Sequence, residues 1–360
     1  MFSLRDKHIA QDIVNRLQSL KVNYQFMHVC GTHQDALLKH GLDHLLQQCG
    51  ITIRQGPGCP VCVTTPKEIE EMMLLAKKGA IITSFGDMLQ VPGKYSSLQQ
   101  LKTTGCDVRT VYSIEDAVAI ALENPTKHVV FMAVGFETTA PSTASTLLNS
   151  PPENFFVLCC HRLIPPALSA LLQMGDLHID GFIDPGHVST IIGVTPYEKL
   201  TKKYGVAQVI AGFEPLDILM SVWMLVQQLK QNNPRVDNEY IRAVSAEGNK
   251  KAQMILSEVF SPVDIKWRGF PVIPLSGYKL KKRFECYDAR IVFKQDLEPL
   301  SSESFEEPVG CLCGEVLRGV ISSEQCSLFG RLCTPSTPVG PCMVSNEGSC
   351  QIAYRYKKSE

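Results

Sequence analysis

Two cysteines lie two residues apart in "GPGCPVC" (56–62), a run too rich in glycine and proline for the interior of a helix or strand. A Cys-x-x-Cys pair can form a short reversible disulfide, and the same spacing suits zinc or iron. A structural zinc site would need two more ligands, and the sequence has no second Cys-x-x-Cys. The pattern therefore favours a redox or ligand role for Cys59 and Cys62 over a plain structural turn.

A third cysteine, Cys30, comes at the end of an apolar segment and just before a helix predicted to begin at Thr32. The positive end of the helix dipole would stabilise a thiolate there, and the nearby His33 could assist. A lowered pKa would make Cys30 a better nucleophile or a better ligand for a soft metal. The alternative interpretation is a buried cysteine at the end of a strand.

The last fifty residues are dense in thiols, and no histidine follows His187. This excludes mixed Cys/His zinc sites in the tail and leaves an all-thiolate zinc or iron–sulfur site. The irregular, long spacings fit a cluster better than the paired knuckles of a zinc ribbon, and four thiolates suffice for a [4Fe–4S] cluster. The cysteines of the tail are Cys311, Cys313, Cys326, Cys333, Cys342 and Cys350.

Two carboxylates are further candidates. Glu137 in "GFETTAP" could act as an acid or base or accept a hydrogen bond from a ligand, or it could be the N-terminal carboxylate of a helix. Glu247 lies in "SAEG".

His161 with Arg162, and His187, are also candidates, although single histidines are more often structural. The glycine-rich stretches match neither a dinucleotide fingerprint nor a Walker loop, so nucleotide binding is not supported.

Composition limits the class of protein. The chain has 360 residues, enough for two or three domains, and a formal net charge of −1. That charge gives no electrostatic footprint for nucleic acid or for an anionic membrane. The amino terminus carries charges where a signal peptide needs an apolar core, and no apolar run approaches the roughly 20 residues that span a bilayer. We therefore expect a cytoplasmic protein, in which clustered cysteines indicate metal binding or thiol chemistry.

The elements that must position these residues alternate between strand and helix. A first helix over 6–20 carries Ile9, Ile13 and Leu17 on one face. Apolar, β-branched runs that fit buried parallel strands occur at 24–29, 51–54, 80–85, 108–112, 128–136, 154–160, 180–184 and 206–213. Helices are predicted between them at 32–46, 65–79, 113–124, 165–174, 195–205 and 215–231. Thr65 and Glu68 have the spacing of a capping box at the start of the helix over 65–79.

The candidate residues follow the predicted strands. In open α/β sheets, ligands bind beyond the carboxyl ends of the strands. Cys30, the "GPGCPVC" loop and Glu137 all lie at such ends, as do "CHRLIPP" and "DPGHVS". We therefore expect one crevice to collect them.

The predicted fold is α/β, with two similar parallel-sheet α/β domains plus a small C-terminal iron–sulfur domain. "GFE" occurs after two apolar strands, at 135–137 and at 212–214, which hints at two similar units. The polar, proline-containing stretch 230–238 indicates a boundary, and a helix is expected near 239–260. The predicted division is a helix packing on the body (1–21), α/β domain I (22–124), α/β domain II (125–238) and a cluster-carrying C-terminal domain (239–360).

Taken together, the motifs resemble those of one family, HypD, the maturation factor of [NiFe] hydrogenases. The sequence departs from the family's pattern at Gln34 and in lacking a proline before Cys326. The matching stretches cover essentially the whole chain: "CGTHQ" (30–34), "GPGCPVC" (56–62), "GFETTAP" (135–141), "CHRLIPPAL" (160–168), "SAEG" (245–248), and in the tail "CGEVLRG", "CSLFG" and "CTPSTPVGPCMVSNEG".

The resemblance implies an assembly scaffold with redox activity rather than a conventional turnover enzyme. HypD-like proteins have two α/β domains and a [4Fe–4S] domain, and together with a small partner, HypC, they hold an iron atom that acquires two cyanides and one carbon monoxide. Cyanide comes from HypE with HypF, and the finished Fe(CN)2CO unit goes to the hydrogenase large subunit. The resemblance also implies that the isolated chain is a monomer.

The resemblance also assigns roles to residues. Cys30 would hold the iron jointly with a cysteine of HypC, and His33 lies beside it. Cys59 and Cys62 would be a dithiol/disulfide pair that passes reducing equivalents between the iron site and the cluster. Glu137 and Glu247 lie in matching motifs and are kept as catalytic candidates. The expected cluster ligands are Cys313, Cys326, Cys333 and Cys350, with Cys311 and Cys342 as alternates.

Two other functions would use some of the same residues. An iron–sulfur thiol–disulfide oxidoreductase acting on a protein disulfide would need the cluster and the Cys59/Cys62 pair, but it gives Cys30 no necessary role. A zinc-stabilised binding module is the second alternative. Radical chemistry with S-adenosylmethionine is not supported, because no compact Cys-x-x-x-Cys-x-x-Cys occurs.

Overall fold

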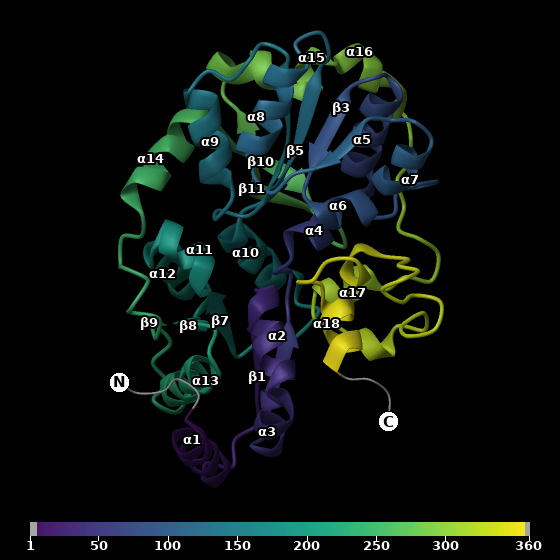
Figure 1. The fold of residues 1–360 in the computed structure, drawn as a ribbon. Coiled ribbons are helices and arrows are strands. Elements are labelled where there is room, and N and C mark those ends of the chain that lie inside the picture. The colour runs from purple at the N-terminus through teal and green to yellow at the C-terminus, as the bar shows by residue number, and fades with distance from the viewer. Residues whose placement is uncertain (1–5, 357–360) are drawn as a thin grey trace.

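Two parallel β-sheets form the framework of the protein, whose computed structural model describes residues 6–356 (Figure 1). The lower sheet in the view of Figure 1, sheet A, has the strand order β2-β1-β7-β8-β9. The upper sheet, sheet B, has the order β4-β3-β5-β6. All neighbouring strands within these two sheets are parallel, whereas β10 and β11 form a separate antiparallel pair. The predicted α/β class with parallel sheets is therefore confirmed.

The bounds of the elements are as follows. The strands are β1 (Tyr24–His28), β2 (Ile51–Gln55), β3 (Ile81–Ser84), β4 (Val108–Thr110), β5 (Val129–Gly135), β6 (Phe155–His161), β7 (Gly181–Pro185), β8 (Ala207–Ala211), β9 (Val236–Asn238), β10 (Phe260–Lys266) and β11 (Val272–Leu280). The first helices are α1 (Lys7–Ser19), α2 (Gly31–Lys39), α3 (Leu42–Gln48), α4 (Pro60–Val63), α5 (Pro66–Lys77), α6 (Gly86–Gln90), α7 (Leu98–Thr103), α8 (Ile114–Glu123) and α9 (Ala140–Leu148). The later helices are α10 (Ile164–Met174), α11 (Gly186–Ile192), α12 (Thr195–Tyr204), α13 (Pro215–Lys230), α14 (Lys250–Val259), α15 (Ala289–Val292), α16 (Lys294–Leu297), α17 (Cys313–Leu317) and α18 (Ser349–Tyr356). Short 3-10 helices are η1 (Lys282–Tyr287), η2 (Glu298–Ser301), η3 (Ser323–Gln325) and η4 (Pro341–Met343).

Helices cover both faces of each sheet. Helices α1, α2, α3 and α13 build one apolar layer on sheet A, in which Leu17, Leu46 and Val222 are fully buried. Helices α11 and α12 cover the opposite face of sheet A and contact β7, β8 and β9. Sheet B lies between α8 and α9 on one face and α4 and α5 on the other. Strands β5 and β6 are buried along their whole lengths, as is expected of parallel strands covered on both faces.

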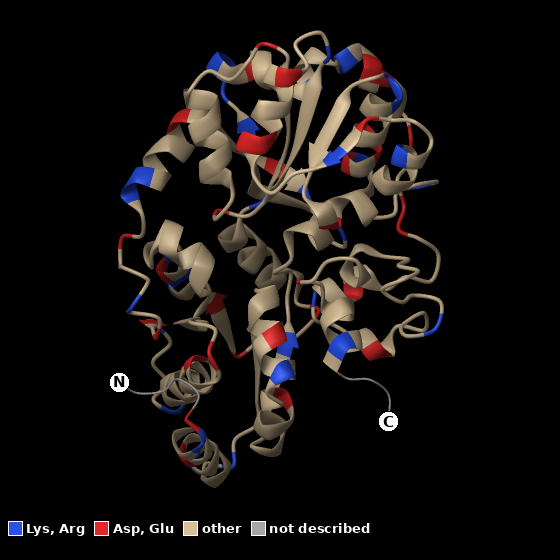
Figure 2. Cartoon of the chain, in the orientation of Figure 1, with Lys and Arg blue, Asp and Glu red and all other residues tan. Residues whose placement is uncertain are grey.

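Charged residues of both signs are interspersed over the outer helices, and few lie on the strands (Figure 2). This distribution agrees with the net charge of −1. None of the helices between residues 6 and 356 combines the length and the apolar character that crossing a bilayer would require.

The two sheets do not follow the division between residues 124 and 125 that the sequence suggested. Sheet A combines β1 and β2 with the much later strands β7, β8 and β9, whereas sheet B takes all four of its strands from 81–161. The junction is the pairing of β1 with β7, in which Phe26 lies opposite Gly181. A strand–helix alternation gives the order of elements along the chain but does not say which strands pair, and a long-range pairing of this kind leaves no local signal.

Three predicted elements also differ. The helix expected over 32–46 is two helices, α2 and α3, because Gly41 adopts the left-handed conformation (φ 65°) between them. The stretch 230–238, expected to be a boundary, contains β9 at the edge of sheet A. The helix expected near 239–260 is confined to α14, which begins only after Asn249 caps it.

The C-terminal segment (yellow in Figure 1) lies at mid-height along one side of the molecule, between the levels of the two sheets. Helix α18 packs on α2, which follows the first strand of sheet A. The 3-10 helix η4 packs on α4, which leads into sheet B. The cysteine-rich tail is thereby placed against the two segments that carry Cys30 and the Cys-x-x-Cys pair.

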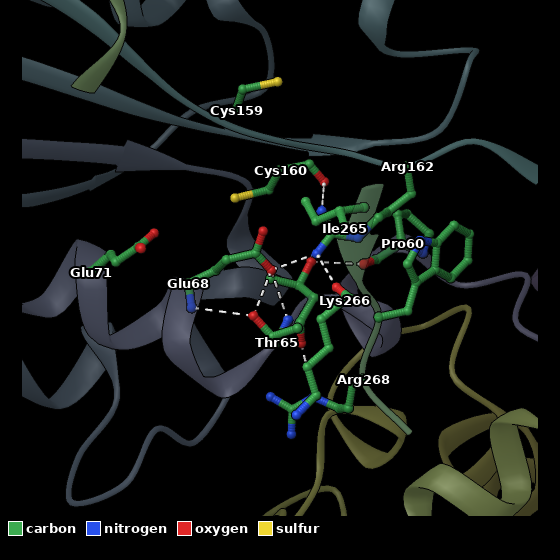
Figure 3. Close-up of polar contacts among 12 residues, drawn as sticks. Pro60, Thr65, Glu68, Glu71, Cys159, Cys160, Arg162, Ile265, Lys266 and Arg268 are labelled. Carbon is green, nitrogen blue, oxygen red and sulfur yellow. Dashed lines mark hydrogen bonds and ion pairs between the residues drawn. The ribbon is translucent and has the colours of Figure 1, made fainter. Parts of the chain in front are cut away.

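The predicted capping box at Thr65 is present, and it is part of a larger buried network (Figure 3). The Glu68 carboxylate accepts the backbone N–H of Thr65 at 2.8 Å and also an N–H of the Arg162 guanidinium at 2.6 Å. Both side chains of this ion pair are buried, and Arg290 contacts Glu68 and Glu71 from the other side. Burial raises the pKa of Glu68, but Arg162 and Arg290 outweigh it and hold the pKa below its ordinary value. The network fixes the start of α5 to the end of β6.

We predict that Glu68→Ala lowers the free energy of unfolding by about 3–5 kcal/mol, because it leaves the buried Arg162 charge without its partner. Urea unfolding followed by circular dichroism measures this loss. The deficit should be full at neutral pH and should narrow as the pH falls below the ordinary carboxylate range, since the wild type then loses the same ion pair. Glu258→Ala, which removes an exposed partner of Arg283, is the matched control and should cost no more than about 1 kcal/mol. Equal losses in the two variants would contradict the prediction.

Candidate metal and thiol redox centre

Cys30 is buried at the N-cap of α2, directly after β1. Burial and, after it, the carboxylate of Glu347 raise the pKa of its thiol to about 11, although the backbone N–H groups of Thr32 and His33 favour the thiolate. The expectation of a lowered pKa was therefore wrong, because a helix of this length provides less stabilisation than desolvation removes. Cys30 is a neutral thiol in the bare chain, and a metal that binds it must displace the proton.

His33 is buried and neutral. Its Nε2–H donates to the carbonyl of Gly212 at 2.9 Å, and burial lowers the pKa of the ring to about 3. Its Nδ1 is buried and has no hydrogen-bond partner. The ring stacks on Phe213, which stacks in turn on His187. His33 is thus held by sheet A as an uncharged imidazole with one free acceptor, one turn into the helix that Cys30 caps.

Cys59 and Cys62 form a disulfide and are both buried. Cys59 caps α4, and its Sγ accepts the N–H of Cys62 at 3.1 Å. The preceding residue, Gly58, lies against the backbone of Val29 and Cys30 so closely that any Cβ would overlap it. The N–H of Gly56 bonds the carbonyl of His28, which fixes the loop to the end of β1. The disulfide loop therefore contacts the Cys30 segment through its backbone.

On its other side the disulfide faces the C-terminal segment. The Sγ of Cys62 lies 3.9 Å from the carbonyl of Pro341, the residue before Cys342. The chain thus places the Cys59–Cys62 pair between Cys30 and the cysteines of the tail, which are far from it in sequence.

All six tail cysteines line one small cavity, together with apolar residues such as Leu328, Phe329 and Met343. Five of the six are buried and Cys311 is half-buried. The cavity has a volume of about 10 Å³, and thiols within it hydrogen-bond to one another, as Cys313 does with Cys311 and Cys342. The N–H of Val339 points at the Sγ of Cys333 at 3.4 Å.

This donor set fits an iron–sulfur cluster. The lining contains thiols, apolar side chains and a backbone donor to sulfur, and neither carboxylates nor imidazoles. Within residues 6–356, no three or more His, Cys, Asp or Glu side chains are grouped to hold a single metal ion. The thiolates of a cubane bind four different irons and lie farther apart than the ligands of one ion, so the thiols would have to separate to admit it. The geometry does not select four of the six, and the choice of Cys313, Cys326, Cys333 and Cys350 stays a prediction.

Glu137 lies just beyond β5 and is fully enclosed. Its Oε1 accepts the N–H of Ile164 at 3.0 Å, and its Oε2 is buried without a partner. Burial raises the pKa of this carboxyl to about 8, so it is protonated at neutral pH and can donate a proton. Glu247 differs: its side chain is 70% exposed on the loop before α14 and forms an ion pair with Lys250.

The remaining candidates have structural partners. His161 is buried and bonds Thr143 through Nε2 at 3.0 Å, and Arg162 belongs to the buried network with Glu68. Glu347 was missed, although it lies in the tail stretch "SNEGS" and acts on Cys30. Its sequence signals were its place in the matching stretch "CTPSTPVGPCMVSNEG" and its nearness to Cys350, and the packing of the tail on α2 could not be foreseen from either.

Comparison with known proteins finds related sequences over nearly the whole chain. The family model named HypD, described as the hydrogenase formation hypA family, matches residues 6–357. A putative hydrogenase expression/formation protein of Methanocaldococcus jannaschii is 45% identical over 364 residues, which cover 99% of this chain and 100% of that protein. The hydrogenase maturation factor HypD of Cupriavidus necator is 40% identical, with 98% of this chain and 95% of the relative covered. That of Escherichia coli is 42% identical, with 93% and 90% covered.

We predict that Glu347→Gln speeds the alkylation of Cys30 by iodoacetamide at pH 8 in the isolated chain. Removing the carboxylate lowers the Cys30 pKa, and each unit of pKa changes the thiolate fraction about tenfold in this range. Peptide mass spectrometry resolves Cys30 from the other cysteines. Glu298→Gln, a change of the same charge in the exposed start of η2, should leave the rate as in the wild type. An unchanged or slower rate in Glu347→Gln would show that the carboxylate does not act on Cys30.

Proposed function

We propose that this chain, which belongs to the HypD family of hydrogenase formation proteins, is the scaffold on which the Fe(CN)2CO unit of a [NiFe] hydrogenase is assembled. The observation that carries the proposal is the line of contacts from Cys30 through the Cys59–Cys62 disulfide to the cysteine-lined cavity. A metal-binding thiol, a two-electron store and a thiolate cage are what assembly of a reduced iron centre on a protein needs.

Cys30 is proposed to bind the iron that is the cargo of the scaffold. The thiol must lose its proton when iron binds, since only the thiolate is a ligand. His33 is a weak base, because burial lowers the pKa of its ring to about 3, and it is proposed to stay a neutral imidazole beside the iron site rather than to take that proton. A cysteine of the small partner HypC would supply a second thiolate to the same iron.

Cys59 and Cys62 are proposed to store two electrons. Reduction of their disulfide takes up two electrons and two protons and yields two thiols. Their reoxidation to the disulfide releases the two electrons and two protons again, and the electrons would return iron that has become ferric to the ferrous state. The electrons come from a low-potential one-electron donor protein of the iron–sulfur or flavin class. A [4Fe–4S] cluster held by four of the tail cysteines would transfer them singly when bound. The position of Cys62 beside Pro341 places the disulfide next to that cavity.

The chemistry of the ligands defines the remaining partners. Carbon monoxide and cyanide are strong-field ligands, so the iron has to stay ferrous while it acquires them. Cyanide is proposed to come from HypE with HypF, and the finished unit to go to the hydrogenase large subunit in the cytoplasm. Glu137, a buried protonated carboxyl, is a candidate proton donor in these steps.

We predict that the chain purified anaerobically with HypC shows infrared bands of metal-bound cyanide and carbon monoxide, and that Cys30→Ala loses them. Under the proposal, Cys30 is the one ligand that this chain provides to the cargo iron, and the substitution removes it. Cys49→Ala, which changes another buried cysteine, is the matched control and should keep the bands. A brown iron–sulfur protein without such bands in the wild type would instead favour the thiol–disulfide oxidoreductase.

A second prediction concerns the disulfide. Cys59→Ser should abolish hydrogenase maturation in cells while the purified protein keeps the visible absorption of its cluster, since Cys59 lies outside the cysteine-lined cavity. Hydrogenase activity and the absorption spectrum are measured on the same strain. If the variant also loses the cluster absorption, Cys59 acts as a cluster ligand or a structural element and the electron-storing role is refuted.

A further inference from the structure

Arg268 is a buried arginine between β10 and β11 that none of the motifs of the proposed function contains. Its backbone N–H donates to the carbonyl of Val63, and its Nε–H donates to the carbonyl of Thr64 at 2.8 Å. These two carbonyls end the short helix α4 that carries Cys62. Arg268 therefore holds the C-terminal end of the disulfide segment through these two hydrogen bonds, while the backbone contact of Gly58 fixes its beginning.

The same arginine also contacts the cysteine-rich tail region. Its Nη1 forms an ion pair with Glu307 at 2.8 Å, and the guanidinium is 1% exposed against 31% for the carboxylate. The next residue, Gly269, lies against the backbone of Gly314, which directly follows Cys313. In Figure 3 the guanidinium lies between the α4–α5 segment and the C-terminal segment.

The charge of Arg268 lies near the cysteine-rich tail. The residue after it, Gly269, is in backbone contact with Gly314, which follows Cys313, and the Arg268 guanidinium pairs with Glu307. One cation and one anion therefore lie next to the segment that carries Cys313.

One donor of Arg268 is left without a partner. Its Nη2 is buried and makes no hydrogen bond, although buried guanidinium nitrogens nearly always have one. The bare chain therefore lacks an acceptor at this place. Thiolate sulfur, or a sulfide bound by the tail thiolates, is an acceptor of the right charge.

We propose that Arg268 is a positioning residue that joins the Cys59–Cys62 segment to the thiolate cage of the tail and holds a positive charge beside that cage. This inference rests on the proposed function, since it needs a cluster in the cage. A buried cation stabilises the reduced, more negative form of such a group and so raises its reduction potential. Glu307 offsets part of this charge.

The test uses the full chain, reconstituted anaerobically with iron and sulfide, and an EPR-monitored redox titration of the cluster. Arg268→Gln should shift the midpoint potential to more negative values, and Glu307→Gln should shift it to less negative values. Arg268→Lys keeps the positive charge, so its midpoint potential should lie close to that of the wild type. Arg318→Gln is the matched control: Arg318 lies five residues after Cys313, but its guanidinium pairs with Asp176, and its loss should leave the potential unchanged.

A purely structural role predicts a different pattern. Unchanged potentials in Arg268→Gln and Glu307→Gln, or shifts of the same sign in both, would overturn the inference. If Arg268→Gln does not fold, as judged by circular dichroism, Arg268→Lys and Glu307→Gln decide the question. If the wild-type protein takes up no cluster, both the proposed cofactor and this inference are overturned. This outcome is distinguished from a failure of the inference alone, because it is seen before any substitution is made.

The positioning role has its own readout. The buried disulfide should be reduced by dithiothreitol severalfold faster in Arg268→Gln and in Arg268→Lys than in the wild type, because neither side chain reproduces the bond from Nε to Thr64. Trapping of the Cys59 and Cys62 thiols, followed by mass spectrometry, measures the rate. Wild-type rates in both variants would remove the positioning role.

Discussion

The close contact of two backbones, that of Gly58 with Val29 and Cys30, is the constraint on which the rest of the centre depends. No side chain fits between them, so only glycine at position 58 allows the disulfide loop to lie against the end of β1. The contact joins a loop that leads into sheet B to the first strand of sheet A. It also sets the distance at which Cys59 and Cys62 lie from the proposed iron-binding thiol.

Burial decides the charge of every group near this contact. Because water is excluded, Cys30 is a thiol, His33 is a neutral imidazole and Glu137 is a protonated acid at neutral pH. These three groups are therefore uncharged in the bare chain. Binding of an iron cation to Cys30 would introduce a positive charge into this site, and the thiol of Cys30 would lose its proton on binding.

Two buried arginines, Arg162 and Arg268, and the half-buried Arg290 hold the segments that the chain brings together from distant positions. Arg162 and Arg290 fix the start of α5 through Glu68, and Arg268 fixes the end of α4. Buried ion pairs contribute little net stability, but each strongly penalises a structure in which one partner is displaced. Their effect is therefore to specify one arrangement of the disulfide segment relative to the sheets and the tail.

The sequence by itself determined the α/β class, the buried parallel strands, the capping box at Thr65 and the family, because each depends on local pattern or on short motifs. It also indicated which thiols to consider. Tertiary structure alone decided which strands share a sheet, since the pairing of β1 with β7 has no local signal. It likewise decided the pKa of Cys30, which depends on desolvation and on Glu347, a residue more than three hundred positions away. Helix position predicted a lowered pKa, and burial reversed it, because the free energy of removing a charge from water exceeds what one helix terminus returns.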